Sequence, residues 1–208
     1  MLTAREALDR LRAGNARFSS GLRSLEALLG PARRAELVDG QEPFAIVLGC
    51  SDSRVPAEMV FDQGLGDLFV IRVAGNIVAP SQVGSVEFAA ERFGTRLVVV
   101  LGHSSCSAVQ AAVDDVLQPG APATRSIQSI VDRVRPAVRG VIEAHGSHDL
   151  PALMRLSVRA NVRKSVDHLR HGSALLEDLI RGEGLLVVGA EYDLGTGVVE
   201  FFEGLPVD

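Results

Sequence analysis

Two short apolar segments, each ending in glycine and followed by metal-binding side chains, constrain the fold of this chain most strongly. Residues 44–49 read FAIVLG and lead into CSDSR, while residues 96–102 read RLVVVLG and lead into HSSC. Apolar runs of this length that end at a turn signal are typical of buried strands. Because functional residues collect at the carboxyl ends of strands in open α/β sheets, we expect both segments to contribute to one site.

The residues that follow these two segments are those expected of a metal centre. Cys50, Asp52 and Arg54 alternate after the first strand, so an extended backbone would direct all three side chains to one face. His103 and Cys106 follow the second strand and are close enough in sequence to bind one ion from a single turn. The two strand ends therefore predict one site that is divided across a crevice.

Cysteine usage favours a metal site over a disulfide. The chain has only two cysteines, Cys50 and Cys106, and in a reducing compartment such a pair points to metal binding or catalysis. Zn²⁺ takes thiolate, imidazole and carboxylate ligands in a tetrahedron, and a catalytic zinc keeps one position open. We therefore expect Cys50, His103 and Cys106 to bind zinc. Asp52 is expected either to be the fourth ligand or to orient whatever occupies the fourth position.

Cys106 is expected in the first turn of a helix, where the positive end of the helix dipole favours a thiolate. The competing interpretation treats both cysteines as small buried apolar residues and His103 as an ordinary loop residue. The position of all three at the ends of two predicted parallel strands favours the metal site.

The order of the other elements predicts an α/β fold. Strands and helices alternate up to residue 117, which indicates a parallel sheet with right-handed crossovers, and residues 185–202 read as a hairpin. We expect one domain over residues 1–208, with a central mostly parallel β-sheet, an antiparallel edge strand, flanking helices and an N-terminal helical arm over about residues 1–40. The expected strands are 44–48, 68–74, 96–101, 185–190 and 198–202. The expected helices are 3–18, 32–38, 55–61, 81–93, 106–117, 127–139, a long helix ending at 171, and 173–181, with a loop over 118–122.

Composition excludes several classes of partner. The net charge of −5 gives no general attraction to nucleic acid or to an anionic membrane, and the absence of Trp leaves no stacking platform for single-stranded nucleic acid. No apolar stretch approaches the roughly 20 residues of a membrane-spanning helix. The first residues, MLTARE, lack the basic region and apolar core of a secretory signal, so we expect a cytoplasmic protein.

The motifs CSDSR at 50–54 and GHSSC at 102–106 resemble those of the β-class carbonic anhydrases. The similarity extends over nearly the whole chain, including GQEP at 40–43 and FVIRVAGN at 69–76. The resemblance implies the β-carbonic anhydrase fold and an assembly of dimers or larger, with the active site at the dimer interface. It also identifies a small-molecule substrate pair, CO2 and bicarbonate.

The resemblance assigns a role to each residue of the two motifs. Cys50, His103 and Cys106 would bind one Zn²⁺ per subunit, and Asp52 and Arg54 would form a catalytic dyad. Zinc lowers the pKa of bound water from about 15.7 toward 7, so that zinc-bound hydroxide attacks CO2. Asp52 would orient that hydroxide while Arg54 keeps Asp52 ionised. In the closed form known in the family, Asp52 leaves Arg54 and becomes the fourth zinc ligand.

Two further residues are expected to act on the substrate. Gln41 matches a glutamine that in one subgroup donates a hydrogen bond to substrate across the dimer interface. The other subgroup has a regulatory bicarbonate site built around a Trp at the position of Val47, and this chain has no Trp. Arg72 and Tyr192 are of residue types that also occur around that regulatory site. Phe88 is expected either in the apolar wall that receives CO2 or in ordinary core packing.

Two alternatives to reversible CO2 hydration remain. An enzyme on the same scaffold could hydrolyse CS2 or COS with the same zinc hydroxide, because the metal ligands do not distinguish these substrates. A non-catalytic protein could use the cluster as a structural zinc site or as a redox-responsive thiol pair. The Asp52–Arg54 pair argues against the second alternative, since a structural metal site needs no orienting dyad.

Overall fold

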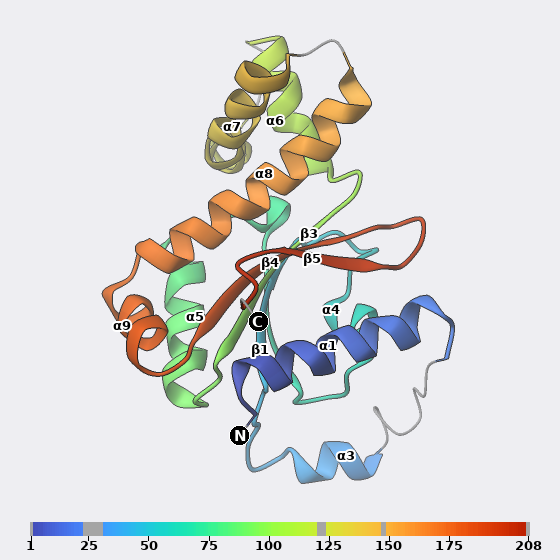
Figure 1. The fold of residues 1–208 in the computed structure, drawn as a ribbon, viewed down its shortest axis with the longest axis vertical. Coiled ribbons are helices and arrows are strands. Elements are labelled where there is room, and N and C mark those ends of the chain that lie inside the picture. The colour runs from blue at the N-terminus through green and yellow to red at the C-terminus, as the bar shows by residue number, and fades with distance from the viewer. Residues whose placement is uncertain (1, 23–30, 120–123, 147–148, 207–208) are drawn as a thin grey trace.

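A computed structural model describes residues 2–22, 31–119, 124–146 and 149–206, and its centre is a sheet of five strands (Figure 1). The strand order is β2-β1-β3-β4-β5, with β1, β2, β3 and β4 parallel and β5 antiparallel to β4. The strands are β1 (Ala45–Gly49), β2 (Leu68–Arg72), β3 (Leu97–His103), β4 (Leu186–Tyr192) and β5 (Val199–Glu203). The predicted mostly parallel sheet with an antiparallel edge strand is therefore confirmed.

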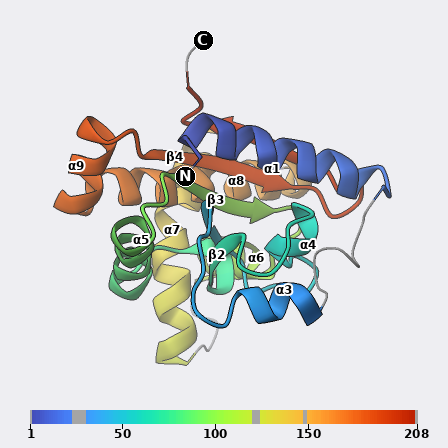
Figure 2. The same cartoon turned by 90° about the horizontal axis from the view of Figure 1, so that it is seen from below.

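Helices cover both faces of this sheet, and Figures 1 and 2 show α1 and α5 on opposite sides of the strands. The helices are α1 (Ala4–Ser19), α3 (Pro31–Glu36), α4 (Ala57–Val60), the short 3₁₀ helix η1 (Ala74–Asn76), α5 (Pro80–Arg92), α6 (Ser107–Leu117), α7 (Arg125–His145), α8 (Leu150–His171) and α9 (Ala174–Gly182). Every residue of β1 and β3 is buried, as expected for central parallel strands covered on two sides.

Alternation along β1 divides the core into two layers. Val47 faces a cluster that contains Leu8 and Leu11 of α1, whereas Ile46 and Leu48 face a cluster formed with α5, α8 and α9. A third cluster joins α6, α7 and α8 and includes both cysteines. Both cysteines, which follow the ends of β1 and β3, are therefore packed among apolar side chains of this third cluster.

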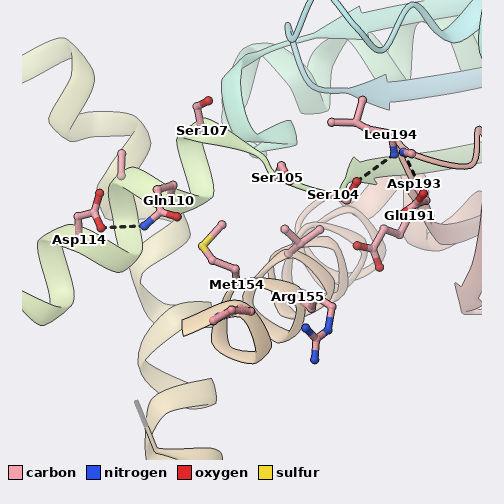
Figure 3. Close-up of a pocket in the computed structure, with 14 residues that line it drawn as sticks. Ser104, Ser105, Ser107, Gln110, Asp114, Met154, Arg155, Glu191, Asp193 and Leu194 are labelled. Carbon is pink, nitrogen blue, oxygen red and sulfur yellow. Dashed lines mark hydrogen bonds between the residues drawn. The ribbon is translucent and has the colours of Figure 1, made fainter. Parts of the chain in front are cut away.

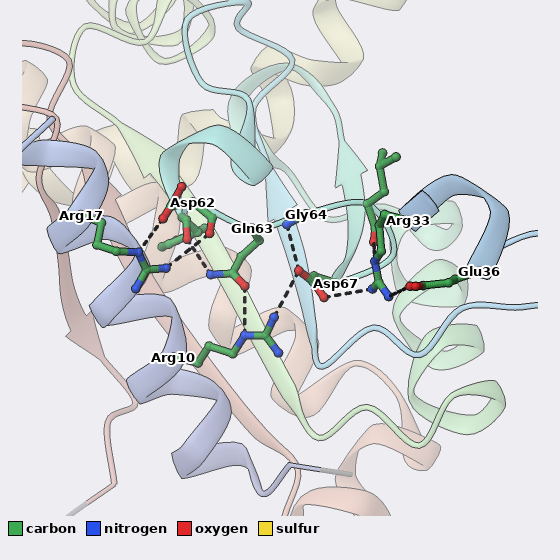
Figure 4. A network of polar contacts seen from close by, with 10 residues as sticks. Arg10, Arg17, Arg33, Glu36, Asp62, Gln63, Gly64 and Asp67 are labelled. Carbon is green, nitrogen blue, oxygen red and sulfur yellow. Dashed lines mark hydrogen bonds and ion pairs between the residues drawn. The ribbon is translucent and has the colours of Figure 1, made fainter. Parts of the chain in front are cut away.

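Charged side chains attach the N-terminal helices to the segment between α4 and β2 (Figure 4). Arg17 donates from Nε to the buried carboxylate of Asp62 at 2.5 Å. Arg10 of α1 and Arg33 of α3 both pair with Asp67, at 3.1 and 3.5 Å. Because α1 and α3 converge on one carboxylate, the arm is held against the rest of its own chain by polar contacts as well as by apolar packing.

Several predicted boundaries differ from those observed. The predicted helix over 55–61 is only α4, because Val55 N–H donates to the Asp52 carbonyl in a turn and Pro56 is the N-cap residue. The helix predicted to end at 139 continues to His145, since Val141 extends its buried face by another turn. In the predicted 118–122 loop, residues 120–122 lie outside the described residues. Within the described ranges, no helix combines the length and apolar character needed to cross a membrane.

Helix α8 approaches the sheet so closely that β3 needs a glycine. A Cβ atom added to Gly102 would lie 2.5 Å from Val162 Cγ2 of α8. We expect Gly102→Ala to lower the free energy of unfolding by about 1–3 kcal/mol, the usual cost of overpacking a core. Urea denaturation measures this change.

The matched control for this variant is Gly140→Ala. Gly140 lies in α7, and nothing comes within 4 Å of an added Cβ. Its substitution is expected to be neutral or to stabilise the protein by about 0.5–1 kcal/mol, because alanine favours a helix more than glycine does. Equal stability of Gly102→Ala and wild type would contradict the close packing of α8 on β3.

Candidate metal centre and active site

The ends of the adjacent strands β1 and β3 bring the three predicted metal ligands together. Gly49 of β1 pairs with Leu101 of β3, so the residues that follow each strand emerge side by side. The ligand atoms of Cys50, His103 and Cys106 all lie within 4.8 Å of one another, and all three side chains are buried. Sequence reasoning therefore identified a real spatial cluster from residues more than fifty positions apart.

His103 presents one ring nitrogen to this cluster. Its Nδ1 lies 2.9 Å from the carbonyl oxygen of Ser104, which accepts the Nδ1 proton in the neutral tautomer. Its Nε2 is buried and has no hydrogen-bond partner among the described residues. Burial alone lowers the pKa of His103, but the Cys50 sulfur and the Ser104 carbonyl together raise it by more. An unpartnered imidazole nitrogen beside two sulfurs is the arrangement that a metal ion would satisfy.

The two sulfurs lie close enough to interact directly. Cys50 Sγ and Cys106 Sγ share a hydrogen bond at 4.0 Å, which lowers the pKa of Cys50 and raises the pKa of Cys106. The Gly75 N–H also donates to Cys50 Sγ, at 3.3 Å. Cys106 is the N-cap residue of α6 and lies just before its first turn, so the prediction of a first-turn cysteine was off by one position. Two cysteines and one imidazole fit Zn²⁺ and leave a fourth position open.

Asp52 and Arg54 form a bidentate pair beside the cluster. Arg54 donates from Nε to Asp52 Oδ1 at 2.9 Å and from Nη2 to Oδ2 at 2.7 Å. These bonds hold the pKa of Asp52 well below its usual range, so its carboxylate stays ionised. Asp52 Oδ2 lies 3.9 Å from His103 Nε2, which places this anion next to the candidate metal position.

The backbone that carries this pair is not extended throughout. Residues 53 and 54 lie in a turn, closed by the bond from Val55 N–H to the Asp52 carbonyl at 3.0 Å. The condition under which all three side chains would leave one face, an extended backbone through Arg54, is therefore not met beyond Asp52. The turn brings the Arg54 guanidinium back onto the carboxylate, so the pair forms between residues only two positions apart.

Arg72 fixes the same segment from β2. Its Nε donates to the Cys50 carbonyl at 3.1 Å, and its Nη2 donates to the Asp52 carbonyl at 2.7 Å. Arg72 therefore holds the backbone of residues 50–52, a role that no local sequence signal identified.

Val47 and Tyr192, the other two positions compared above with the regulatory bicarbonate site, belong to the apolar cluster on the α1 side of the sheet.

Gln41 and Phe88 are not part of the Cys50–His103–Cys106 cluster. Gln41 is exposed and precedes β1, whose opposite end carries Cys50. Phe88 on α5 is 55% exposed and packs against Phe93 at a ring-centroid distance of 5.9 Å. Phe93 also lines a cavity with Gln41, so Gln41 and Phe88 flank one surface of the molecule.

A cavity of about 750 Å³ lies beside the turn at residues 104–105, between His103 and Cys106 (Figure 3). It is lined by Ser104 and Ser105 of the turn, by Met154 of α8 and by the loop between β4 and β5. The Leu194 N–H donates to Ser104 Oγ at 3.0 Å, which attaches the turn to that loop. None of the predicted metal ligands or dyad residues lines this cavity, so it is separate from the Cys50–His103–Cys106 cluster.

Comparison with known proteins agrees with this geometry. The family model described as carbonic anhydrase matches residues 45–199, a range that includes all five motif residues. Carbonic anhydrase 2 of Mycobacterium tuberculosis is 38% identical over 190 residues, which cover 90% of this chain and 87% of the relative. A tetrameric β-carbonic anhydrase from Sordaria macrospora aligns with a TM-score of 0.75 at 24% identity, over 83% of this chain and 87% of that one. The chain belongs to the β-class carbonic anhydrases.

Other relatives cover the chain equally well. The carbonic anhydrase of Mycolicibacterium smegmatis is 37% identical over 198 residues, or 91% of this chain and 89% of that relative. The fold of an Aspergillus fumigatus β-carbonic anhydrase aligns with a TM-score of 0.75 at 23% identity, over 98% of this chain and 92% of that one. This carbonic anhydrase is therefore an enzyme, and its family supports CO2 hydration as its activity.

Proposed function

We propose that this carbonic anhydrase binds one Zn²⁺ per chain through Cys50, His103 and Cys106 and hydrates CO2 reversibly to bicarbonate and a proton. The observation that carries the proposal is the buried, unpartnered His103 Nε2, which lies among two sulfurs and next to an ionised carboxylate. When bound, zinc supplies a coordinated water whose pKa falls toward 7. The chain supplies the ligands and the groups that orient the reaction.

Asp52 is proposed to accept a hydrogen bond from the nucleophile and thereby to aim its lone pair at CO2. Both carboxylate oxygens of Asp52 accept hydrogen bonds from Arg54, so the carboxylate is held in one orientation and kept ionised. The Arg72 bonds to the Cys50 and Asp52 carbonyls keep the backbone under both groups fixed. Such preorganisation favours catalysis because the groups need not reorganise during the reaction.

The same carboxylate is proposed to close the site when it turns away from Arg54. Asp52 Oδ2 lies 3.9 Å from His103 Nε2, so a modest movement would bring it to the fourth metal position. That movement would break both side-chain hydrogen bonds with Arg54. The proposal assigns the Asp52–Arg54 pairing to the open form and the loss of that pairing to the closed form.

A homodimer, or a dimer of dimers, is proposed to complete the substrate site. Gln41 and Phe88 flank one surface, whereas Cys50 lies at the other end of β1. In an assembly, Gln41 would donate a hydrogen bond to the substrate in the partner's site, and Phe88 would contribute to its apolar wall. The relative from Sordaria macrospora is described as tetrameric.

Substrate comparison tests the proposed reaction. The zinc-loaded protein is assayed with CO2, COS and CS2 at equal concentrations and the same pH. We expect CO2 hydration to have the largest kcat/KM of the three reactions. Faster hydrolysis of COS or CS2 would show that the enzyme prefers a sulfur analogue of CO2. Inactivity on all three substrates with zinc bound would indicate a non-catalytic role for the metal site.

A further inference from the structure

The short loop between β2 and α5 touches the metal site through its backbone. The N–H of Gly75 in η1 donates to Cys50 Sγ at 3.3 Å, and this bond is buried. Gly75 has a φ of +71°, a conformation that glycine adopts without strain. A Cβ atom at this position would lie 3.1 Å from Ala108 Cβ of α6 and 3.6 Å from Val134 Cγ2 of α7. The loop is therefore confined on the sides of α6 and α7.

Helix α8 holds this loop by two side chains that lie one turn apart. Asn161 Nδ2 donates to the Gly75 carbonyl at 2.7 Å, and Ser165 Oγ donates to the Asn76 carbonyl at 2.9 Å. Asn161 is 2% exposed and Ser165 is 4% exposed. These bonds anchor the two consecutive residues next to the Cys50 contact.

We infer that Asn161 and Ser165 are positioning residues for the metal centre, because they hold η1 so that the Gly75 N–H points at Cys50 Sγ. The inference rests on the proposed zinc site. An N–H···S bond withdraws charge from a thiolate and fixes its direction, and such outer contacts tune a ligand's affinity for metal. The side-chain hydrogen bonds of Asn161 and Ser165 go to the Gly75 and Asn76 carbonyls, so both residues act on Cys50 through the loop.

The surroundings of the loop explain why both anchors are needed. The bond between Asn161 and the Gly75 carbonyl is buried, so removal of the Asn161 amide would leave this carbonyl without a hydrogen-bond partner. A buried carbonyl without a partner is costly, and the backbone would tend to rotate toward another donor. A cavity of about 220 Å³ lies beside these bonds and is lined by Ile77, Asn161 and Ser165 among other residues. The cavity reaches Ile77 and Val78, the residues that follow η1, so the chain leaving η1 has space to shift when an anchor is removed. Such a shift would turn the Gly75 N–H away from Cys50.

The test uses the full chain loaded with Zn²⁺ or, for spectroscopy, with Co²⁺. For Asn161→Leu we expect about 10-fold weaker zinc binding in competition with a chelator. This is the low end of the 10–100-fold loss in metal affinity that follows when a residue supporting a metal ligand is removed. We also expect a shift of the thiolate-to-cobalt charge-transfer band, because this band reports the hydrogen bond to sulfur. A purely structural role would lower the melting temperature without moving the band.

Ser157→Ala is the matched control. Ser157 is on the same helix and fully buried, and its Oγ has no hydrogen-bond partner among the described residues. Its substitution is expected to leave the zinc affinity and the charge-transfer band of the wild type unchanged. A band shift in Ser157→Ala as large as that in Asn161→Leu would overturn the inference, since any change in α8 would then have the same effect.

Ser165→Ala and Ser165→Thr provide a second, milder test that does not depend on the folding of Asn161→Leu. The alanine variant is expected to shift the charge-transfer band in the same direction but less, and the threonine variant, which keeps the hydroxyl, to restore it. Wild-type affinity and spectrum in both Asn161→Leu and Ser165→Ala would overturn the positioning role alone. Failure of the wild type to bind either metal would instead overturn the proposed zinc site.

Discussion

Asp52→Asn is expected to lower kcat for CO2 hydration by about 10²–10³-fold, the usual cost of losing one preorganised hydrogen-bonding group, while the protein keeps one zinc per chain. The amide has nearly the shape of the carboxylate but carries no charge, and its NH2 group would face the N–H donors of Arg54. The variant therefore loses the fixed anion that aims the nucleophile. Stopped-flow kinetics together with metal analysis measure both quantities.

Asp178→Asn is the matched control for this variant. Asp178 also pairs with an arginine, Arg181, at 2.6 Å, but on the exposed surface of α9. Its substitution is expected to leave turnover unchanged, because exposed ion pairs contribute little. Full activity of Asp52→Asn would contradict the dyad, and loss of zinc from Asp52→Asn would show that Asp52 is mainly a ligand.

Cys106→Ser is expected to lose both zinc and CO2 hydration. The hydroxyl of serine is a much poorer zinc ligand than a thiolate, so the loss in affinity should exceed the 10–100-fold typical of outer contacts. Folding is expected to survive, because Cys106 is the N-cap residue of α6 and serine is among the most favourable residues there. Chelator competition measures the affinity, and far-ultraviolet circular dichroism measures the retained helix.

Ser107→Ala is the control for this second variant. Ser107 is the neighbouring residue, begins α6 and lines the cavity beside the turn, yet it offers no ligand to the cluster. We expect its zinc content and turnover to match the wild type. Tight binding of zinc by Cys106→Ser would contradict the assignment of Cys106 as a metal ligand.

The central strands could be predicted because their information is local. Residues 45–48 and 97–101 are uniformly apolar, end near a glycine and are followed by side chains with metal chemistry. Burial on both faces requires such runs, so the sequence and the parallel sheet agree. The meeting of Cys50 with His103 and Cys106 then follows from the adjacency of β1 and β3, which topology rules favour.

The supporting contacts could not be predicted, because they join distant segments through side chains of ordinary type. The bond from Asn161 to the Gly75 carbonyl spans 86 positions, and nothing in the local sequence of α8 distinguishes this asparagine from a surface residue. Cys50, Asp52 and Arg54 would share one face only along an extended backbone, and the turn at residues 53–54 breaks that condition. Gln41 and Phe88 remain predictions, since their proposed roles require a second chain.

The most direct test of the account is stopped-flow CO2 hydration by the zinc-loaded protein, scanned from about pH 6.5 to 9, the range around the pKa that zinc gives to coordinated water. The account predicts hydration well above the uncatalysed rate, rising with pH as the nucleophile is formed and disappearing when a chelator removes the metal. Absence of catalysis at every pH, with one zinc per chain shown to be bound, would contradict it.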